Sequence, residues 1–230
     1  MSNQVVTIFP SIHQVQEPTY ISLGTALERI KKGKHTTRIE KIREGDKSEK
    51  TKLPIVLFSG EFSGRKDDML KRHSGLIVLD FDHIDIDRGK SVIGSDKYVR
   101  SCWVSPSGNG IKALVEVLEP SRHRDHFRSL QQYFDSQYGL EVDSTGINES
   151  RACFESCDPD IVIKNDSVSG HHAEIIKRGE QFIITDLDDN QITAFHPGAM
   201  LQSHLNRVAE VANVGLGIVA PDGKDGMRAH

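Results

Sequence analysis

The strongest constraint on the fold of this chain is the run GLIVLDFD at residues 75–82, which is apolar throughout and then ends in two aspartates. An unbroken apolar run rich in β-branched residues is typical of a strand that is covered on both faces. Side chains alternate along a strand, so Asp80 and Asp82 should project to the same side. The sequence therefore predicts two carboxylates side by side at the end of a buried strand.

Two adjacent carboxylates repel each other unless a cation or a proton separates them. Hard oxygen ligands on a rigid strand end suit Mg²⁺ or Mn²⁺, with phosphate oxygens completing the coordination shell. We therefore predict a divalent-metal site at Asp80 and Asp82. The alternative is a solvated acidic turn at a strand end, and Asp85 and Asp87 just beyond are expected to be turn residues.

Local patterns predict further elements around this strand. Residues 5–9 form a short strand, and Ser22 caps a helix that stops at Gly33. Residues 34–52 are charged and predict a mobile loop or an exposed helix. Residues 53–62 form a second buried run, and the segments around PSGNG (106–110) form a β-hairpin. Ser121 opens a helix that Gly139 ends.

The remaining segments complete an α/β (α+β) protein. Residues 151–157 and 160–163 are expected to be strands, residues 174–187 a hairpin or a helix–strand pair, and Pro197 the start of a last helix. We predict an N-terminal αβ element at 1–52, a compact α/β core at 53–170 and an appended C-terminal element at 171–230.

Composition narrows the class of protein. The chain has 230 residues, of which 37% are hydrophobic and 27% charged, as in ordinary globular proteins. No apolar run approaches the ~20 residues that cross a bilayer, and the N-terminus lacks the pattern of a signal peptide. Three cysteines make a disulfide framework unexpected and favour a reducing compartment, the cytoplasm.

Charge is unevenly placed along the chain. The net charge of −4 argues against non-specific coating of nucleic acid, yet residues 31–50, 64–73 and 120–128 carry local basic excess. A basic face beside an acidic metal cluster would suit a polyanionic ligand. Solvated helix faces are the alternative explanation of each such run.

A second motif, SPSGNGIK at residues 105–112, combines small residues with glycines. Its backbone N–H groups could form an anion-binding nest, and its side chains add hydroxyl donors and one positive charge. The candidate nucleotide-binding residues here are Ser105, Ser107, Gly108, Gly110 and Lys112. A polar hairpin turn is the alternative. The spacing does not match a P-loop.

The segment EVDSTGINESRACFESCDPD at residues 141–160 offers a third carboxylate. Asp143 follows a short apolar stretch and could join the metal ligands, while Arg151 could fork onto a phosphate. Asp158 competes for the role of third carboxylate, but Pro159 restricts its backbone and favours a turn. Zinc binding by Cys153 and Cys157 with histidines is a weaker alternative, since no second cysteine pair exists.

Together the three motifs LDFD, SPSGNGIK and EVD resemble the PrimPol domains of the archaeo-eukaryotic primase superfamily. The closest resemblance is to the branch found N-terminal to virulence-associated-E-type helicases, over about residues 53–163. The resemblance implies an RRM-like catalytic core and two-metal nucleotidyl transfer. In it, Asp80, Asp82 and Asp143 hold Mg²⁺ or Mn²⁺, and the serines, Lys112 and Arg151 position a triphosphate.

The resemblance also implies partners: nucleoside triphosphates, single-stranded DNA or a primer-template, and a helicase acting in trans, with no membrane. Lys112 stands where many primases place a histidine. That departure leaves open a non-catalytic nucleotide- or DNA-binding module on the same fold. The run LIVLDFDHI also resembles the first motif of haloacid-dehalogenase-type phosphatases, for which Asp222 and Asp225 would be the late acidic pair.

Overall fold

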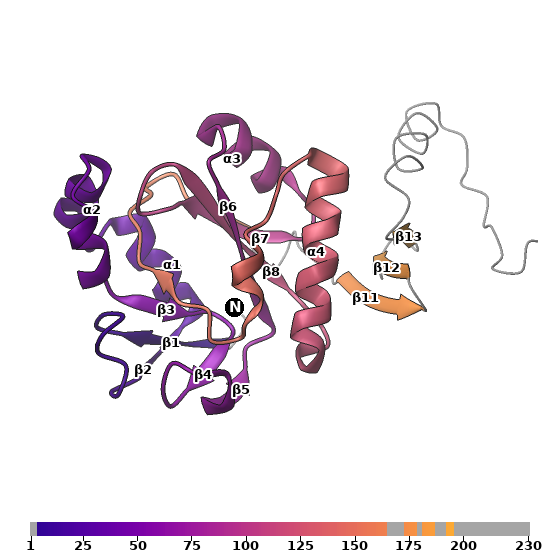
Figure 1. The fold of residues 1–230 in the computed structure, drawn as a ribbon, viewed down its shortest axis with the longest axis horizontal. Helices are drawn as coiled ribbons and strands as arrows, with labels where there is room; N and C mark the ends of the chain where they lie inside the picture. The colour runs from indigo at the N-terminus through magenta and orange to yellow at the C-terminus, as the bar shows by residue number, and fades with distance from the viewer. Residues whose placement is uncertain (1–3, 165–172, 179–180, 187–191, 196–230) are drawn as a thin grey trace, which may run out of the picture. The chain divides into compact units, whose positions relative to one another are not determined.

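The protein is α+β, and its computed structural model describes residues 4–164, 173–178, 181–186 and 192–195 (Figure 1). The chain divides into two units, residues 1–195 and residues 196–230. The helix predicted from Pro197, the pair Asp222 and Asp225, and the histidines at 171 and 172 lie outside the described residues.

A first antiparallel sheet has the strand order β2-β1-β3-β9. Its members are β1 (Val5–Phe9), β2 (Thr19–Ser22), β3 (Ile55–Leu57) and β9 (Cys153–Phe154). Because β1 pairs with β3 and β3 with β9, residues near both ends of the described core share one sheet. The segments 1–52 and 53–170 therefore meet within this sheet.

A second antiparallel sheet has the order β10-β7-β8-β6 and carries the D-x-D strand at its edge. Its members are β6 (Leu76–Asp82), β7 (Val99–Val104), β8 (Gly110–Glu116) and β10 (Val162–Ile163). The predicted hairpin is confirmed, since β7 pairs with β8 on either side of the 105–110 loop. Two smaller sheets are formed by β4 (Gly60–Phe62) with β5 (Leu70–His73), and by β11 (Ala173–Arg178), β12 (Gln181–Asp186) and β13 (Ile192–Phe195).

Strand β6 is buried on both faces, as its apolar run predicts. Ile77, Leu79 and Phe81 pack in one core with helices α3 (Ile86–Ser95) and α4 (His123–Tyr138), and α4 lies along this side of the sheet in Figure 1. Leu76 and Val78 pack in another core with helix α1 (Leu23–Lys32) and strands β1 and β3. The alternation of side chains puts Asp80 and Asp82 on the second of these faces.

Helix ends follow the predicted signals only in part. Ser22 caps α1 by accepting a hydrogen bond from the N–H of Thr25, and Gly33 ends it in the left-handed region, as does Gly139 for α4. Ser121, however, does not open α4. It lies in a 3₁₀ turn, η3 (Pro120–Arg122), and α4 begins at His123 without a side-chain cap.

The charged segment 34–52 is helical rather than a loop. It forms helix α2 (Thr36–Arg43) and the 3₁₀ helix η1 (Lys47–Lys52). Ile39 and Ile42, its two large apolar residues, are 1% and 6% exposed and pack with Leu53. Two isoleucines three residues apart are therefore enough to fasten one face of a charged helix to the domain.

Two further segments differ from the prediction. The run at 53–62 is broken into β3 and β4, where Gly60 approaches Arg72 so closely that a Cβ would lie 2.1 Å from its carbonyl oxygen. Asp85 is not a turn residue but the N-cap of α3, accepting a hydrogen bond from the N–H of Arg88. Of the two alternatives for residues 174–187, a hairpin or a helix–strand pair, the structure supports the first, since β11 and β12 pair as antiparallel strands. In the described segments no helix is long and apolar enough to span a membrane.

A buried histidine pair joins β5 to α4. His73 Nε2 and His123 Nδ1 are 2.9 Å apart, so one ring donates to the other. Burial lowers the pKa of His73 to about 4 and that of His123 to about 3. Both rings are therefore neutral near pH 7, whereas in the unfolded chain they titrate near 6.5. The stability that they contribute is complete above pH 6.5 and is lost as the pH falls toward their folded values.

We predict that His123→Gln makes stability less sensitive to acid. Between about pH 7 and pH 5 the native protein should lose more unfolding free energy than the variant, by about 1–2 kcal/mol, because the variant has one fewer histidine that protonates only on unfolding. Urea unfolding at both pH values measures this difference. His13→Gln, at an exposed position, is the control. A His123 variant as acid-sensitive as the native protein would contradict the assignment.

Candidate metal and nucleotide site

Three carboxylates converge at the end of β6. One oxygen atom from each of Asp80, Asp82 and Asp143 lies within 4.8 Å of the other two. Asp80 and Asp82 come from the strand itself, and the backbone N–H of Asp143 donates to the carbonyl oxygen of Asp80 at 2.8 Å. The main chain therefore ties the third carboxylate to the D-x-D strand, although 61 positions separate it from Asp82.

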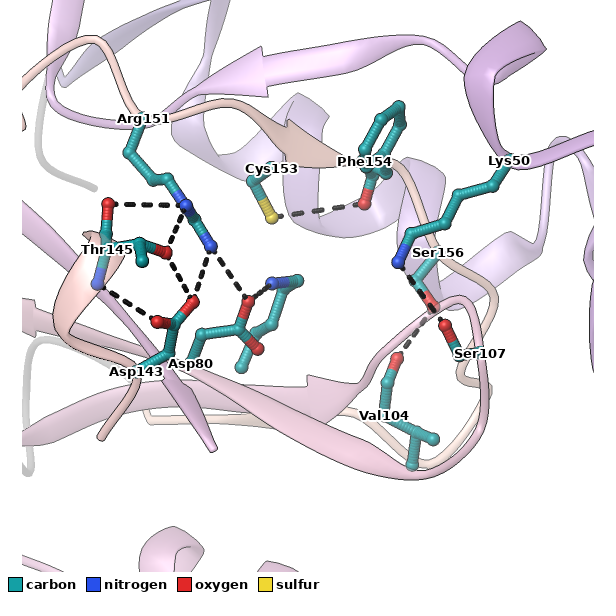
Figure 2. A network of polar contacts seen from close by, with 11 residues as sticks. Lys50, Asp80, Val104, Ser107, Asp143, Thr145, Arg151, Cys153, Phe154 and Ser156 are labelled. Carbon is teal, nitrogen blue, oxygen red and sulfur yellow. Dashed lines mark hydrogen bonds and ion pairs between the residues drawn. The ribbon is translucent and has the colours of Figure 1, made fainter. Parts of the chain in front are cut away.

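The carboxylate of Asp143 is held by its own loop and by one arginine. Asp143 caps the 3₁₀ helix η4 (Ser144–Ile147) and accepts hydrogen bonds from the N–H and the hydroxyl of Thr145. Arg151 Nη2 donates to Asp143 Oδ2 at 2.8 Å and lies 3.7 Å from Asp80 Oδ2 (Figure 2). Burial acts to raise the pKa of Asp143, but the Thr145 hydrogen bonds and the charge of Arg151 outweigh it and lower that pKa.

Lys112 pairs with Asp80 across two strands. The register of β6 and β8 sets the two residues opposite each other, and Lys112 Nζ makes an ion pair with Asp80 Oδ2. Burial acts to lower the pKa of Lys112, but the charge of the Asp80 carboxylate and its hydrogen bond raise that pKa, and the ammonium group stays charged. The structure thus directs Lys112 to the carboxylate cluster, and not to the glycine loop with which the sequence grouped it.

The other oxygen of Asp80 has no protein partner within the part of the chain that the structure describes. Asp80 is 9% exposed, and its Oδ1 atom is buried without a hydrogen bond in the described chain. The hydroxyl oxygen of Ser105, which is also buried, likewise has none there. Buried polar atoms in native proteins nearly always have a partner, and both of these residues line one pocket, where a ligand could supply it.

A pocket of about 250 Å³ adjoins these atoms. It is lined by carboxylates, by four cations, by the 105–107 turn and by an apolar side: Asp80, Asp82, Lys50, Arg65, Lys112, Arg151, Ser105, Pro106, Ser107, Ile12, Ala152 and Phe154. Residues from both large sheets contribute to it. A small anionic ligand with an apolar part would match such a lining.

The glycine loop is shaped by close approaches. Gly108 has a φ of +76°, which disfavours other residues. At Gly110 a Cβ would lie 2.6 Å from the carbonyl oxygen of Phe81, so only glycine lets β8 pair beside the two aspartates. Ser107 Oγ lies 3.4 Å from Lys50 Nζ, as Figure 2 shows. The loop, which connects β7 to β8, therefore forms one border of the site.

Several residues of this pocket were not predicted from the sequence. Lys50 and Arg65 lie in charged stretches where no motif distinguishes them from other cations, and Ile12 and Phe154 carry no chemical signature. Lys50 Nζ lies 5.6 Å from the centre of the Phe154 ring, a cation–π contact. For Lys50, the basic excess of residues 31–50 was the one signal available.

The chain matches two known protein families. The family model described as the BT4734-like N-terminal domain matches residues 48–162, half of the chain. The chain belongs to this family. The region shared with the family contains Asp80, Asp82, Asp143, the 105–112 motif and Arg151. A second model, that of the FHA domain, matches residues 151–206. No curated protein and no solved structure matches the chain.

Asp158, the competing third carboxylate, lies outside the cluster. It accepts hydrogen bonds from Lys90 Nζ at 2.8 and 2.9 Å and from the N–H of Val104 at 2.9 Å. The N–H of Asp160 also donates to it, which is the turn role expected beside Pro159. Asp158 thus joins α3 to the end of β7.

We predict that Asp158→Ala destabilises the fold by about 2–4 kcal/mol, because it leaves the mostly buried Lys90 ammonium without its partner. The side chains of Lys90 and Asp158 are 18% and 6% exposed. Urea unfolding measures the change. Asp160→Ala, two residues away and exposed, should be nearly neutral. Equal effects of the two substitutions would contradict the structural role of Asp158.

Proposed function

We propose that this protein is a metal-dependent nucleotidyltransferase of the primase-polymerase type. The observation that carries the proposal is the convergence of three carboxylates beside a pocket lined by four cations. A carboxylate cluster suits divalent ions, and a cationic wall next to it suits a triphosphate. The three motifs that resemble primase-polymerase domains supply the three carboxylates and Lys112.

The residues present fit Mg²⁺ or Mn²⁺. All three candidate ligands offer hard carboxylate oxygens, and the unpartnered Oδ1 of Asp80 is a coordination position that no protein group fills among the described residues. Bound ions would supply charge neutralisation at the reacting phosphate and make a 3′-hydroxyl a better nucleophile. Asp80, Asp82 and Asp143 would hold them.

The cations and the glycine loop would bind and orient the nucleotide. Lys50, Arg65 and Arg151 line the pocket around the carboxylates and can pair with phosphate oxygens. Ser105 has a hydroxyl free to donate, and the turn through Ser107, Gly108 and Gly110 brings backbone close to a ligand. Lys112 would neutralise the charge of Asp80 rather than bind a phosphate directly.

The remaining parts of the proposal follow from the resemblance. The substrates would be nucleoside triphosphates and a 3′-hydroxyl on a single-stranded DNA template or primer-template. The setting would be replication of a mobile element, phage or bacterial genome in the cytoplasm, with a helicase in trans. The three free thiols are compatible with a reducing compartment.

A second candidate is a non-catalytic module that binds nucleotide or DNA on the same fold. The observation that favours it is that Lys112 and Arg151 already neutralise Asp80 and Asp143. A site whose carboxylates are balanced by its own cations can bind a polyanion without a metal. Metal binding and primer extension separate the two candidates.

We predict that the native protein binds Mn²⁺ and that Asp80→Asn with Asp82→Asn weakens this binding at least about tenfold, because two of the three carboxylate charges are lost. Electron paramagnetic resonance of free Mn²⁺ measures the affinity. The control is Asp87→Asn with Asp135→Asn, which removes two exposed charges elsewhere. Unchanged Mn²⁺ affinity in the first double variant would show that the cluster is not the metal site.

We also predict that Asp143→Asn lowers primer extension with Mn²⁺ at least about hundredfold while the unfolding midpoint changes little, since an asparagine oxygen can still cap η4. Extension of a labelled primer on a DNA template is the assay. Glu141→Gln, an exposed neighbour, should extend normally. A native protein that binds triphosphate and metal but extends no primer would favour the non-catalytic candidate.

A further inference from the structure

Residues 31–52 carry a charge opposite to that of the whole chain. Nine lysines and arginines stand there against four acidic residues, whereas the chain has a net charge of −4. The structure folds this segment into α2 and η1, which Ile39, Ile42 and Leu53 fasten to the domain. The excess positive charge therefore lies on helices that are packed against the domain.

Several of these cations are exposed and have no acidic partner. Lys34, Lys41 and Lys47 are exposed, and none of them makes an ion pair within the described residues. Arg38 and Lys52 share Glu49. An open pocket of about 270 Å³ on this unit is lined by Lys34, His35, Thr36, Thr37, Arg38, Lys41 and Glu49. The surface therefore has unbalanced positive charge beside an open recess.

Two other cations of the segment extend this charge to the metal and nucleotide site. Lys50 lines the site's pocket and bonds Ser107 in the glycine loop. Arg43 donates to the carbonyl oxygen of Cys157 at 3.0 Å, and its side chain lies 3.4 Å from where a Cβ of Gly108 would be. We call these five residues, Lys34, Lys41, Arg43, Lys47 and Lys50, the α2–η1 cation surface. It joins the candidate site at the glycine loop.

The aromatic ring at the same border favours an unpaired strand. Phe154 is half-buried, lines the pocket and carries Lys50 over its ring. Bases of a single strand can stack on such a ring, whereas the bases of a duplex are already stacked and paired. Cations combined with an aromatic ring are usual in sites for single-stranded nucleic acid.

We propose that the α2–η1 cation surface binds the phosphate backbone of single-stranded DNA that runs to the metal and nucleotide site. This inference rests on the proposed function, because it takes the pocket as the place where the strand meets a nucleotide. The DNA strand would run along the segment that contains α2 and η1. Lys34, Lys41 and Lys47 would contact its phosphates without touching the nucleotide in the pocket.

The test compares two triple variants of the full chain by fluorescence anisotropy with a labelled oligothymidylate at several salt concentrations. One variant is Lys34→Gln, Lys41→Gln and Lys47→Gln. The control removes three exposed cations outside the segment, Lys71→Gln, Arg72→Gln and Arg128→Gln. The first should weaken binding at least about fivefold and reduce the salt slope by about 2, since each phosphate contact on a single strand contributes about 0.7. The control should bind as the native protein does.

Three results would overturn the inference: unchanged oligothymidylate binding in the first variant, equal losses in both variants, or native binding of duplex DNA or polyglutamate as tight as that of the oligothymidylate. Binding of Mn²⁺ with a nucleoside triphosphate is measured in parallel. It should be the same in the native protein and in the first variant. If the native protein does not bind the triphosphate, the proposed function is contradicted. If the first variant binds the triphosphate as the native protein does but binds DNA more weakly, the result concerns the surface alone.

Discussion

The neutralisation of Asp80 is the interaction on which the rest of the site depends. A carboxylate that is 9% exposed at the end of a strand covered on both faces cannot remain charged without a partner nearby. The register of β6 and β8 supplies Lys112 directly opposite, and Arg151 approaches from the segment before β9. A one-residue slip of this register would turn Lys112 to the other face of the sheet.

Protein contacts hold Asp143 in the cluster. Its N–H donates to the carbonyl oxygen of Asp80, and its carboxylate accepts hydrogen bonds from Thr145 and Arg151. Asp80 differs, since one oxygen is paired and the other is buried without a partner. A site built in this way has a preformed charge balance and one open coordination position, which is consistent with both candidate functions.

Packing, and not local sequence, sets the positions of the cations in the charged segment 31–52. Its composition alone is that of a solvated stretch, and only Ile39 and Ile42 fasten its helix. Because they do, Arg43 lies beside Gly108 and Lys50 bonds Ser107 in the 105–110 loop, while the exposed Lys41 and Lys47 belong to the same helical segment. Cations that would be interchangeable in a flexible loop thereby occupy different positions relative to the pocket.

Elements with local signals could be predicted from the sequence. Side-chain period and glycine conformation depend on near neighbours, and they predict the buried strand ending in Asp80 and Asp82, the β7–β8 hairpin and the helix ends at Gly33 and Gly139. Helix α3 was missed although its cap, Asp85, is a local signal. The start of α4 was missed because no side chain caps it, and the break between β3 and β4 because it depends on the approach of Gly60 to Arg72 of another strand. Local patterns could not show that Lys112 pairs with Asp80, that Asp158 pairs with Lys90, or that Lys50, Arg65 and Phe154 line one pocket. The register of β6 and β8 sets the first contact and the packing of separate segments sets the others, so no periodicity along the chain records them.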